Sequence, residues 1–374
     1  MILLENVTKI FPGHEKPAVD NLSLEVKEGE ICVFVGPSGC GKTTTMKMIN
    51  RLYEITEGKI SVNGEDINKV DVNTLRRNIG YVIQEIGLFP HMTIEENVAT
   101  VPRELKWPRD KTQKRVYELL KLVGLEPTEY AKRRPSALSG GQRQRVGVAR
   151  AMASDPPVLL MDEPFGAVDP ITRGRLQNEF LRLQEQMKKT IVFVTHDIDE
   201  AIKMGDKIAV MREGHLVQYS TPDELLSTPK NEFVASLVGR NRSIKRLHLI
   251  HAESVVKPEL PLIKLKDNLS IIRERIKDSP LEVAAVVDDK DRLLGVVSQS
   301  DIKDLEEENI TASQIYSEIN NYCTDDATLN DVLSIMLNYG EGYVVVTGDD
   351  EKVQGVITLG DIMGVVKDES NSAA

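Results

Sequence analysis

The chain has 374 residues, enough for one to three domains, and its 41% hydrophobic and 28% charged residues are typical of a soluble globular protein. It has no apolar run of the roughly 18 residues that a membrane-spanning helix needs. Its first residues, MILLENVTKIF, lack the pattern of a signal peptide and indicate a first strand. The three cysteines lack metal-ligand spacing, which argues against both a disulfide framework and a zinc site.

Charge divides the chain into two parts. Residues 253–374 contain 25 Asp and Glu and 11 Lys and Arg, a net charge of −14, whereas the whole chain carries −11. Such an acidic surface disfavours nucleic acid and anionic membranes, so we expect no nucleic-acid partner and only weak lipid docking by this part. Between the parts, residues 240–251 (RNRSIKRLHLIH) include four basic residues. We interpret residues 241–250 as a basic, solvated linker, although this segment could itself dock on lipid.

The first chemical motif follows an apolar, β-prone run at residues 30–35 (EICVFV). The glycine-rich stretch GPSGCGKT (36–43) comes next, and a helical pattern follows it. Strand, loop and helix in this order predict a P-loop, whose backbone N–H groups wrap phosphates, although a chance glycine-rich turn is the alternative. Lys42 is expected to reach the β- and γ-phosphates of a nucleotide, and Thr43 to bind Mg²⁺. The candidate nucleotide-binding residues here are Gly36, Pro37, Ser38, Gly39, Cys40, Gly41, Lys42, Thr43 and Thr44.

Two further apolar runs, PVLLMDE (157–163) and TIVFVTHD (190–197), predict buried parallel strands that end in polar residues. Open α/β sheets bind ligands at the carboxyl ends of their strands. Asp162 is therefore expected to hold Mg²⁺, and Glu163 to act as general base on the attacking water. His196 is a candidate γ-phosphate contact, although a lone histidine at a strand end is more often structural.

The sequence LSGGQ at 138–142, together with these motifs, makes residues 1–240 resemble the nucleotide-binding subunit of an ATP-binding-cassette (ABC) transporter. The resemblance implies a head-to-tail homodimer, with ATP between the P-loop of one copy and Ser139, Gly140, Gly141 and Gln142 of the other. It implies that Phe11 stacks on adenine, unless Phe11 is a core aromatic of a strand face. It also implies that Gln84 joins the Mg²⁺ shell and that residues 85–98 form a groove for a transmembrane subunit.

The resemblance can be narrowed to one group of ABC transporters, the quaternary amine importers. The stretches similar to their ATPase subunits are TTTMKMINRL, IGYVIQEIGLFPHMTI, LKWP and MDEPFGAVDPITR. Members of that group carry osmoprotectants such as glycine betaine, carnitine and choline. The resemblance implies a location at the cytoplasmic face of the membrane, held by permease subunits, with a substrate-binding protein in the complex. An ABC importer for another cargo, such as amino acids, and a soluble ABC ATPase are the alternatives.

The C-terminal part is duplicated. GVVSQSDI (295–302) and GVITLGDI (355–362) match at an offset of sixty residues, and each unit has a pattern of helix, strand, turn, strand and helix. The two units, 251–308 and 309–366, resemble a tandem pair of CBS (cystathionine-β-synthase-type) repeats, followed by a polar tail at 367–374 that we expect to be disordered. The chain is therefore predicted to be an α/β protein with a P-loop ABC ATPase domain and an α/β tandem CBS module.

The resemblance to CBS repeats implies regulation, either by a ligand, which would be an adenine nucleotide or cyclic di-AMP, or by ionic strength. Ser298 with Asp301, and Thr358 with Asp361, are candidate ribose contacts. Ser or Thr followed three residues later by Asp is also an ordinary helix cap, so that interpretation stays open. Tyr343 is the candidate for stacking on cyclic di-AMP, or else an ordinary tyrosine of a strand.

Overall fold

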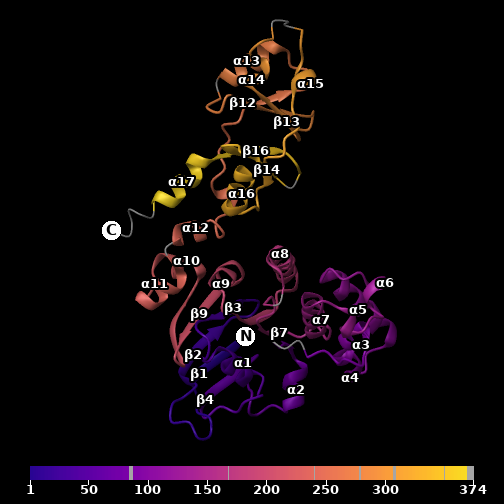
Figure 1. Ribbon diagram of the computed structural model, residues 1–374, viewed down its shortest axis with the longest axis vertical. Coiled ribbons are helices and arrows are strands. Elements are labelled where there is room, and N and C mark those ends of the chain that lie inside the picture. The colour runs from indigo at the N-terminus through magenta and orange to yellow at the C-terminus, as the bar shows by residue number, and fades with distance from the viewer. Residues whose placement is uncertain are drawn as a thin grey trace. The chain divides into compact units, whose positions relative to one another are not determined.

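The computed structural model describes residues 1–83, 87–166, 168–239, 241–277, 279–305, 309–348 and 350–368. The chain divides into two compact units, Met1–Arg240 and Asn241–Ala374 (Figure 1). Both units combine helices with sheets, which confirms the predicted α/β class. Among the described residues, no helix is both long enough and apolar enough to cross a membrane.

The first unit is built on a six-stranded sheet of order β10-β9-β3-β8-β7-β6. The five strands from β9 to β6 are parallel, and β10 pairs antiparallel with β9 at one edge. Every residue of β3, β7 and β8 is buried, as expected of strands covered on both faces. The bounds are β3 Ile31–Val35, β6 Ile79–Val82, β7 Val158–Asp162, β8 Thr190–Val194, β9 Lys207–Arg212 and β10 His215–Ser220.

A second, antiparallel sheet of order β2-β1-β4-β5 lies in the same unit and shares a core with the first. Buried residues of β1, β2 and β4 pack with Phe34 of β3 and with Met46 and Ile49 of α1. This packing holds the helix that follows the glycine-rich loop between the two sheets. The bounds are β1 Ile2–Lys9, β2 Val19–Val26, β4 Glu57–Val62, β5 Glu65–Asp66 and α1 Lys42–Ile49.

Helices α3 to α7 form a lobe to one side of the sheets (Figure 1). In that lobe α7 packs against α3 and α5 and also against strand β6. The helices of the lobe are α3 Ile94–Val98, α4 Thr100–Glu104, α5 Arg109–Leu122, α6 Pro127–Tyr130 and α7 Gly140–Met152, with a short 3₁₀ turn η1 at Pro135–Ala137. The other helices of the unit are α2 Val72–Arg77, α8 Pro170–Met187, α9 Ile198–Met204, α10 Pro222–Ser227 and α11 Glu232–Val238.

The second unit contains two three-stranded sheets, β11-β12-β13 and β14-β15-β16, whose bounds differ by the sixty residues of the sequence repeat. Each sheet pairs its first two strands parallel and its last two antiparallel. The strands are β11 Leu262–Lys264, β12 Val283–Val287, β13 Leu293–Ser298, β14 Tyr322–Thr324, β15 Tyr343–Thr347 and β16 Val353–Thr358. The helices are α12 Arg242–Arg246, η2 Ala252–Ser254, α13 Leu269–Lys277, α14 Gln299–Ile302, α15 Ala312–Ile315, α16 Leu329–Tyr339 and α17 Leu359–Asp368.

The opening segment of each repeat bonds to the last strand of the other repeat. Backbone bonds join Lys257 to Val356 of β16, and Ser317 to Val296 of β13. The duplicated glycines permit this close approach: a Cβ at Gly295 would lie 2.3 Å from the Ser317 oxygen, and one at Gly355 would lie 2.1 Å from the Lys257 oxygen. The sequence pattern showed the repeat but not this exchange.

The basic segment 241–250 differs from a plain solvated linker. It contains helix α12, and Leu247 is 1% exposed within the core of the second repeat. Ile250 packs against the same core. The linker prediction followed from the positive charges of this segment. The apolar residues between those charges instead pack into the core of the second repeat.

Candidate ATP-hydrolysis site

The glycine-rich loop leaves buried strand β3 and enters helix α1 through backbone that only glycine fits. A Cβ at Gly36 would lie 2.2 Å from the Met211 oxygen, and one at Gly41 would lie 2.6 Å from the Ala18 oxygen. Gly41, the N-cap of α1, has a φ of 107° and supplies no side chain to the helix N-terminus. The first N–H groups of α1 are therefore left available to an anion such as a phosphate.

Lys42 is folded over the loop that precedes it. Its Nζ donates to the Gly36 oxygen at 2.6 Å and to the Pro37 oxygen at 3.0 Å, and the residue is 7% exposed. Its Nζ also lies 3.8 Å from Cys40 Sγ. A buried ammonium held by neutral acceptors is a strong donor for a phosphate in the same loop. Ser38 and Gly39 are exposed, Cys40 is buried, and Thr44 is half-buried.

Two of the three residues predicted to hold Mg²⁺, Thr43 and Asp162, lie together although 119 positions separate them. Thr43 Oγ1 donates to Asp162 Oδ1 at 3.2 Å, which joins the start of α1 to the end of β7. Burial raises the pKa of the Asp162 carboxyl, and the Thr43 hydroxyl partly opposes that shift. A buried carboxylate beside a hydroxyl suits Mg²⁺, which usually keeps waters and phosphate oxygens as its other ligands. The residues present therefore fit the cation, which would neutralise charge on the phosphates.

Glu163 and His196 come from neighbouring strands and meet at the same edge of the sheet. Glu163 Oε1 lies 3.1 Å from His196 Nδ1. The Glu163 backbone has a φ of 48°, an unusual conformation for a residue other than glycine. Three bonds hold it: Glu163 N–H donates to the Val194 oxygen at 2.9 Å, and the Glu163 oxygen accepts from Gln144 Nε2 at 2.7 Å and from Gly166 N–H at 3.1 Å. The carboxylate can therefore accept a proton from water at a fixed place.

Gln144 was not singled out by the sequence analysis. It lies on α7, is 4% exposed, and connects the helix that follows LSGGQ to the backbone of Glu163. A glutamine two positions after the motif carries no signal of its own, because its partner is 19 positions away in the sequence. Its position ties the orientation of α7 to that of Glu163, the candidate general base.

The LSGGQ residues form the start of α7. Ser139 Oγ accepts from Gln142 N–H at 3.2 Å, and Gln142 Oε1 accepts from Ser139 N–H at 2.9 Å, which makes a capping box. A Cβ at Gly140 would meet nothing within 4 Å, so this glycine borders open space. No contact between these residues and the P-loop is found among the described parts of one chain. Gly141 continues the same half-buried turn.

Phe11 lies just beyond the end of β1, in a turn rather than on a strand face. Its ring meets the Tyr53 ring edge-to-face at 5.2 Å, and Lys9 Nζ lies 5.0 Å from its centre. Phe11 is half-buried, so part of the ring can stack on a base. Tyr53, which packs against the Phe11 ring, was not predicted. It is 42 positions further along the chain than Phe11 and belongs to no motif. The other residue predicted for Mg²⁺, Gln84, lies outside the described residues.

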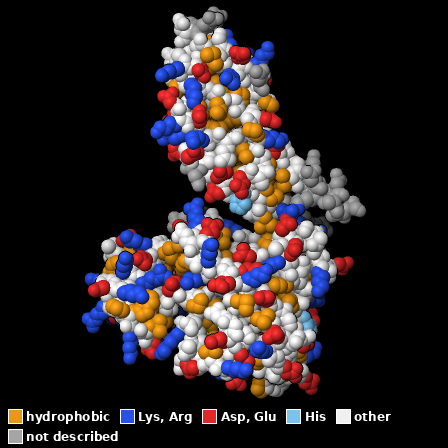
Figure 2. Space-filling model, turned by 180° about the vertical axis from the view of Figure 1, so that it is seen from behind, with side chains coloured by type: hydrophobic (Ala, Val, Ile, Leu, Met, Phe, Trp, Pro, Cys, Tyr) orange, Lys and Arg blue, Asp and Glu red, His pale blue; other side chains and the backbone are white. Residues whose placement is uncertain are grey.

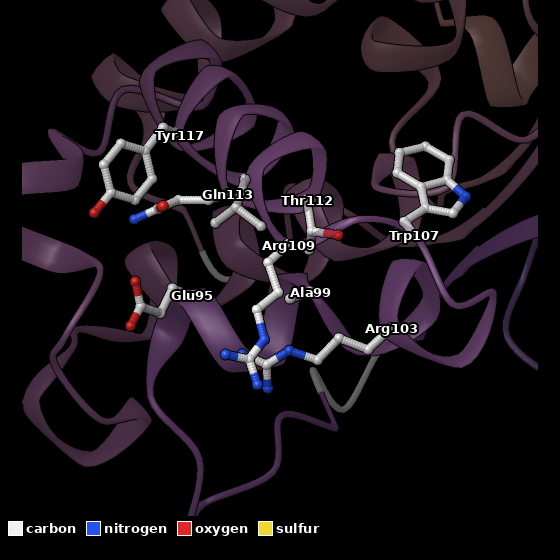
Figure 3. A pocket seen from close by; sticks show the side chains of 9 residues that line it. Glu95, Ala99, Arg103, Trp107, Arg109, Thr112, Gln113 and Tyr117 are labelled. Atoms are coloured by element: carbon white, nitrogen blue, oxygen red, sulfur yellow. The ribbon is translucent and has the colours of Figure 1, made fainter.

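A hollow of about 690 Å³ lies in the helical lobe, between α3, α4 and α5 (Figure 3). The side chains of Arg103 and Arg109 point toward one another in it, and Glu95 and Tyr117 border its other side. Within the described residues, neither arginine forms an ion pair. The predicted groove at 85–98 covers only the α3 wall of this hollow, and residues 85 and 86 lie outside the described ranges.

In the second unit, both Ser/Thr-x-x-Asp pairs are helix caps. Asp301 Oδ2 accepts from Ser298 N–H at 2.8 Å and from its Oγ at 2.6 Å. Asp361 Oδ2 accepts from Thr358 N–H at 2.9 Å and from its Oγ1 at 2.6 Å. Asp361 also pairs with Lys257 at 2.5 Å.

Tyr343 opens β15 and packs against a small core shared by the two repeats, with Leu260, Ala285, Val345 and Val356. Burial raises the pKa of its hydroxyl. This packing accounts for the residue without a ligand, while the ring remains only partly buried. No described hydrogen bond joins Tyr343, Asp301 and Asp361 to one another, but the Asp301 charge lies near enough to Tyr343 to add to the rise of its pKa that burial causes.

A glycine-rich phosphate cradle, a Thr–Asp pair for Mg²⁺, and a carboxylate beside a histidine together define a P-loop ATPase. The family model for ABC transporters matches residues 19–166, and the CBS-domain model matches 252–308 and 313–368. The osmoprotectant import ATP-binding protein OsmV of Salmonella typhimurium is 52% identical over 308 residues, 81% of this chain and 80% of that protein. The chain belongs to the family of ABC transporter ATP-binding proteins.

Two other proteins extend the likeness. The glycine betaine/carnitine/choline transport ATP-binding protein OpuCA of Bacillus subtilis is 44% identical, over 98% of this chain and 97% of that protein. The dimeric post-hydrolysis structure of the ATP-binding cassette MJ0796, bound to ADP and Pi, is 37% identical with a TM-score of 0.55. The matched part is 59% of this chain and 99% of the MJ0796 chain. The first likeness includes the CBS repeats, whereas the second covers 59% of the chain, somewhat less than the 240 residues of the first unit.

Proposed function

We propose that this chain is the ATP-hydrolysing subunit of an importer for quaternary amine osmoprotectants such as glycine betaine, carnitine and choline. The observation that carries the proposal is the 44% identity to a transport subunit for these compounds over 98% of the chain. An importer of amino acids would share the ATPase unit, and the likeness across the CBS repeats favours the amine importer.

The proposed catalytic unit is a homodimer. Ser139, Gly140, Gly141 and Gln142 make no described contact with the P-loop of their own chain, and Gly140 borders open space. A second copy can therefore bring its P-loop against this turn, with ATP between them. In that arrangement Lys42 binds the β- and γ-phosphates, Thr43 and Asp162 hold Mg²⁺, and Gln84 completes the shell. Glu163 takes the proton of the attacking water, and His196 contacts the γ-phosphate.

The chain acts at the cytoplasmic face of the membrane, where permease subunits bind it and a substrate-binding protein delivers the cargo. The hollow between α3, α4 and α5 supports a permease contact. Lys and Arg side chains gather over this lobe (Figure 2), and Arg103 and Arg109 turn toward one another without an ion pair among the described residues. Two adjacent guanidinium groups are stabilised by a carboxylate, so an acidic side chain of the permease suits the hollow.

We assign the ATPase domain to residues 1–240 and the regulatory pair to 251–308 and 309–366. The regulatory ligand is an adenine nucleotide or cyclic di-AMP. Asp301 favours the first repeat as the ribose site, because the equivalent Asp361 is already paired with Lys257. Within the described residues Asp301 makes no ion pair.

The test is uptake by the reconstituted complex. The chain is expressed with its permease and binding protein, and ATP-driven accumulation of labelled glycine betaine, carnitine, choline and an amino acid is measured in vesicles. We expect accumulation of at least one quaternary amine, and none when Glu163→Gln replaces the native chain. Accumulation of the amino acid alone would refute the proposed cargo while leaving the ATPase intact.

The docking proposal has its own test. Arg103→Glu with Arg109→Glu should lower uptake and weaken co-purification of the permease, while ATP hydrolysis by the free subunit stays unchanged. Lys27→Glu, an exposed charge reversal outside the lobe, serves as the control. Equal loss of co-purification in both variants would show that the hollow has no special part in docking.

A further inference from the structure

A buried carboxylate that the proposed mechanism does not use lies one turn after His196. Glu200 belongs to the first turn of α9 and is 9% exposed. Acidic side chains are rarely buried unless they are paired or hydrogen-bonded, because water stabilises their charge. The partners of Glu200 therefore show what its burial serves.

Two hydrogen bonds reach the Glu200 carboxyl, and they come from different segments of the chain. Gln177 Nε2, on α8, donates to Glu200 Oε1 at 2.9 Å. The Thr195 hydroxyl, directly after β8, donates to the same carboxyl. Gln177 and Thr195 are 5% and 2% exposed, so water does not compete for either bond. Movement of either segment would leave a buried polar group without its partner, which is strongly unfavourable.

Thr195 connects this carboxyl to residues 195–197, which we call the His196 turn. Thr195 Oγ1 accepts from Asp197 N–H at 3.0 Å, and Thr195 N–H donates to the Phe34 oxygen of β3 at 3.1 Å. His196 lies between the two bonded residues, and its Nδ1 is 3.1 Å from Glu163 Oε1. The His196 side chain is 66% exposed, so its position depends on the backbone of this turn more than on packing.

Gln177 connects the same carboxyl to helix α8. One turn earlier on that helix, Arg173 Nη2 donates to the Val168 oxygen at 3.0 Å, which ties α8 to the segment that follows Glu163. One bond of Glu200 thus leads to the His196 turn, and the other leads to the helix that comes next after Glu163 in the chain.

The burial of this acid does not serve stability. Desolvation raises the pKa of the Glu200 carboxyl, and the charge of Asp197 adds to the rise. The bonds from Thr195 and Gln177 and the charge of Arg173 oppose the rise without cancelling it. Because the pKa remains raised, the folded chain stabilises the charged form less than water does. A leucine of similar volume would fill the space without that penalty, so the carboxylate is typical of a functional group.

We propose that Glu200 is a positioning residue for His196: its carboxylate ties the His196 turn to α8, so that the imidazole stays within reach of Glu163 and of the γ-phosphate. The inference rests on the proposed function for one point, the contact between His196 and the γ-phosphate. Glu200 acts only through the turn and touches neither the nucleotide nor the attacking water. Because a misplacement of about 1 Å can lower a rate roughly 10²-fold, loss of this link should be visible in turnover.

The first test observes the His196 ring itself, in the full-length chain without nucleotide. The sequence has six histidines, and the NMR signal of His196 in a histidine-labelled chain is assigned by its loss in His196→Ala. Glu200→Leu removes both hydrogen bonds at similar volume, so the His196 signal should shift or broaden. Glu200→Gln loses the same charge but keeps groups that can bond to Thr195 and Gln177, so the signal should stay near the native one.

Lys203→Met is the matched control for this test. Lys203 Nζ donates to the Gly174 oxygen at 3.4 Å, so the variant also removes a contact between α9 and α8, but one that does not reach the His196 turn. Its His196 signal should be unchanged. A native signal in Glu200→Leu would overturn the proposal. An equal shift in Glu200→Leu and Glu200→Gln would also overturn it, because the lost charge alone would then account for the effect.

The second test measures ATP hydrolysis by the same variants. Glu200→Leu should lower kcat on the order of 10–100-fold with little change in KM for ATP, and Glu200→Gln should restore most of it. In a His196→Ala background, Glu200→Leu should lower kcat less than about twofold further, because the residue that it positions is already absent. The same fold-loss in both backgrounds would show that Glu200 acts independently of His196 and would overturn the proposal.

These tests keep the inference apart from the proposed function. Native turnover in His196→Ala would refute the contact between His196 and the γ-phosphate, while the ring signal would still decide whether Glu200 positions the turn. If Glu200→Leu does not fold, Gln177→Leu takes its place, because it removes one of the two bonds and leaves the carboxylate. Its effects should have the same direction and a smaller size, and a native His196 signal with native kcat in that variant would overturn the proposal.

Discussion

In the ATPase unit the polar residues at the strand ends meet partners far along the chain, whereas in the repeated unit the Ser/Thr-x-x-Asp residues cap helices through partners three positions away. Thr43 bonds to Asp162 across 119 positions, and Glu163 to His196 across 33. Ser298 bonds to Asp301, and Thr358 to Asp361, within one helical turn. Bringing polar groups together from distant parts of the chain costs conformational entropy, whereas a local helix cap does not. A long-range polar pair is therefore better evidence of a catalytic or binding site than a cap is. The same kind of motif therefore deserves a catalytic interpretation in one unit and a structural one in the other.

The largest expected effect lies at the long-range pair of the ATPase unit. Glu163→Gln keeps the shape of the side chain but removes the base, so ATP turnover should fall roughly 10²–10⁴-fold. ATP binding and the ATP-induced dimer should remain, since Lys42 and the glycine-rich loop are untouched. Phosphate release and sedimentation with ATP measure the two properties. Glu5→Gln, an exposed residue of β1, is the control, and native turnover in Glu163→Gln would remove Glu163 as the base.

The next effect separates two threonines on the same helix. Thr43→Val removes a hydroxyl that faces Asp162, so Mg²⁺ should bind on the order of tenfold more weakly. Thr45→Val removes a buried hydroxyl that donates to the Gly41 oxygen, so it should lower stability and leave the Mg²⁺ requirement unchanged. The Mg²⁺ dependence of ATP hydrolysis distinguishes them, and Thr43→Ser should restore the native value. Equal Mg²⁺ requirements in all variants would contradict the assignment of Thr43.

More of the ATPase site than of the regulatory unit could be predicted, because the motifs of the ATPase site are short, continuous stretches of sequence. The expected strand at 30–35, the glycine-rich loop and the next helix coincide with β3, Gly36–Gly41 and α1. The order of strands in the sheet, and partners such as Tyr53 and Gln144, depend on packing between distant segments. In the second unit the sixty-residue period was visible, yet the exchange of segments was not, since Lys257 and Ser317 carry no pattern that names their partners.

The repeated glycines give a prediction on stability. Gly355→Ala would place a Cβ 2.1 Å from the Lys257 oxygen, so the exchanged segment must move and the second unit should lose about 1–3 kcal/mol. Gly364→Ala in α17 is the matched control, because nothing lies within 4 Å and alanine favours helix by about 1 kcal/mol. Thermal unfolding of the full chain measures both. Equal stability of the two variants would contradict the close approach of the exchanged segment.

The smallest effect concerns the ion pair that one repeat has and the other lacks. Burial of the Asp361 carboxyl acts to raise its pKa, but hydrogen bonds from Lys257 and Thr358 outweigh burial, and the pKa is lowered. A lowered pKa stabilises the folded chain above the ordinary Asp value of 3.8, and this stability is lost as pH falls through the folded pKa. Lys257→Met should therefore unfold at a lower temperature than the native chain near pH 7. The difference should shrink as the pH falls below about 4, where Asp361 takes up its proton.

Two variants sharpen this prediction. Lys257→Arg keeps the charge and should restore most of the lost stability at neutral pH. Ser317→Ala alters the residue sixty positions after Lys257. The Ser317 side chain is exposed and uncharged, so this variant should change the unfolding temperature little at any pH. A Lys257→Met difference that stayed constant down to pH 2 would show that packing of the lysine side chain, rather than its charge on Asp361, holds the exchanged segment in place.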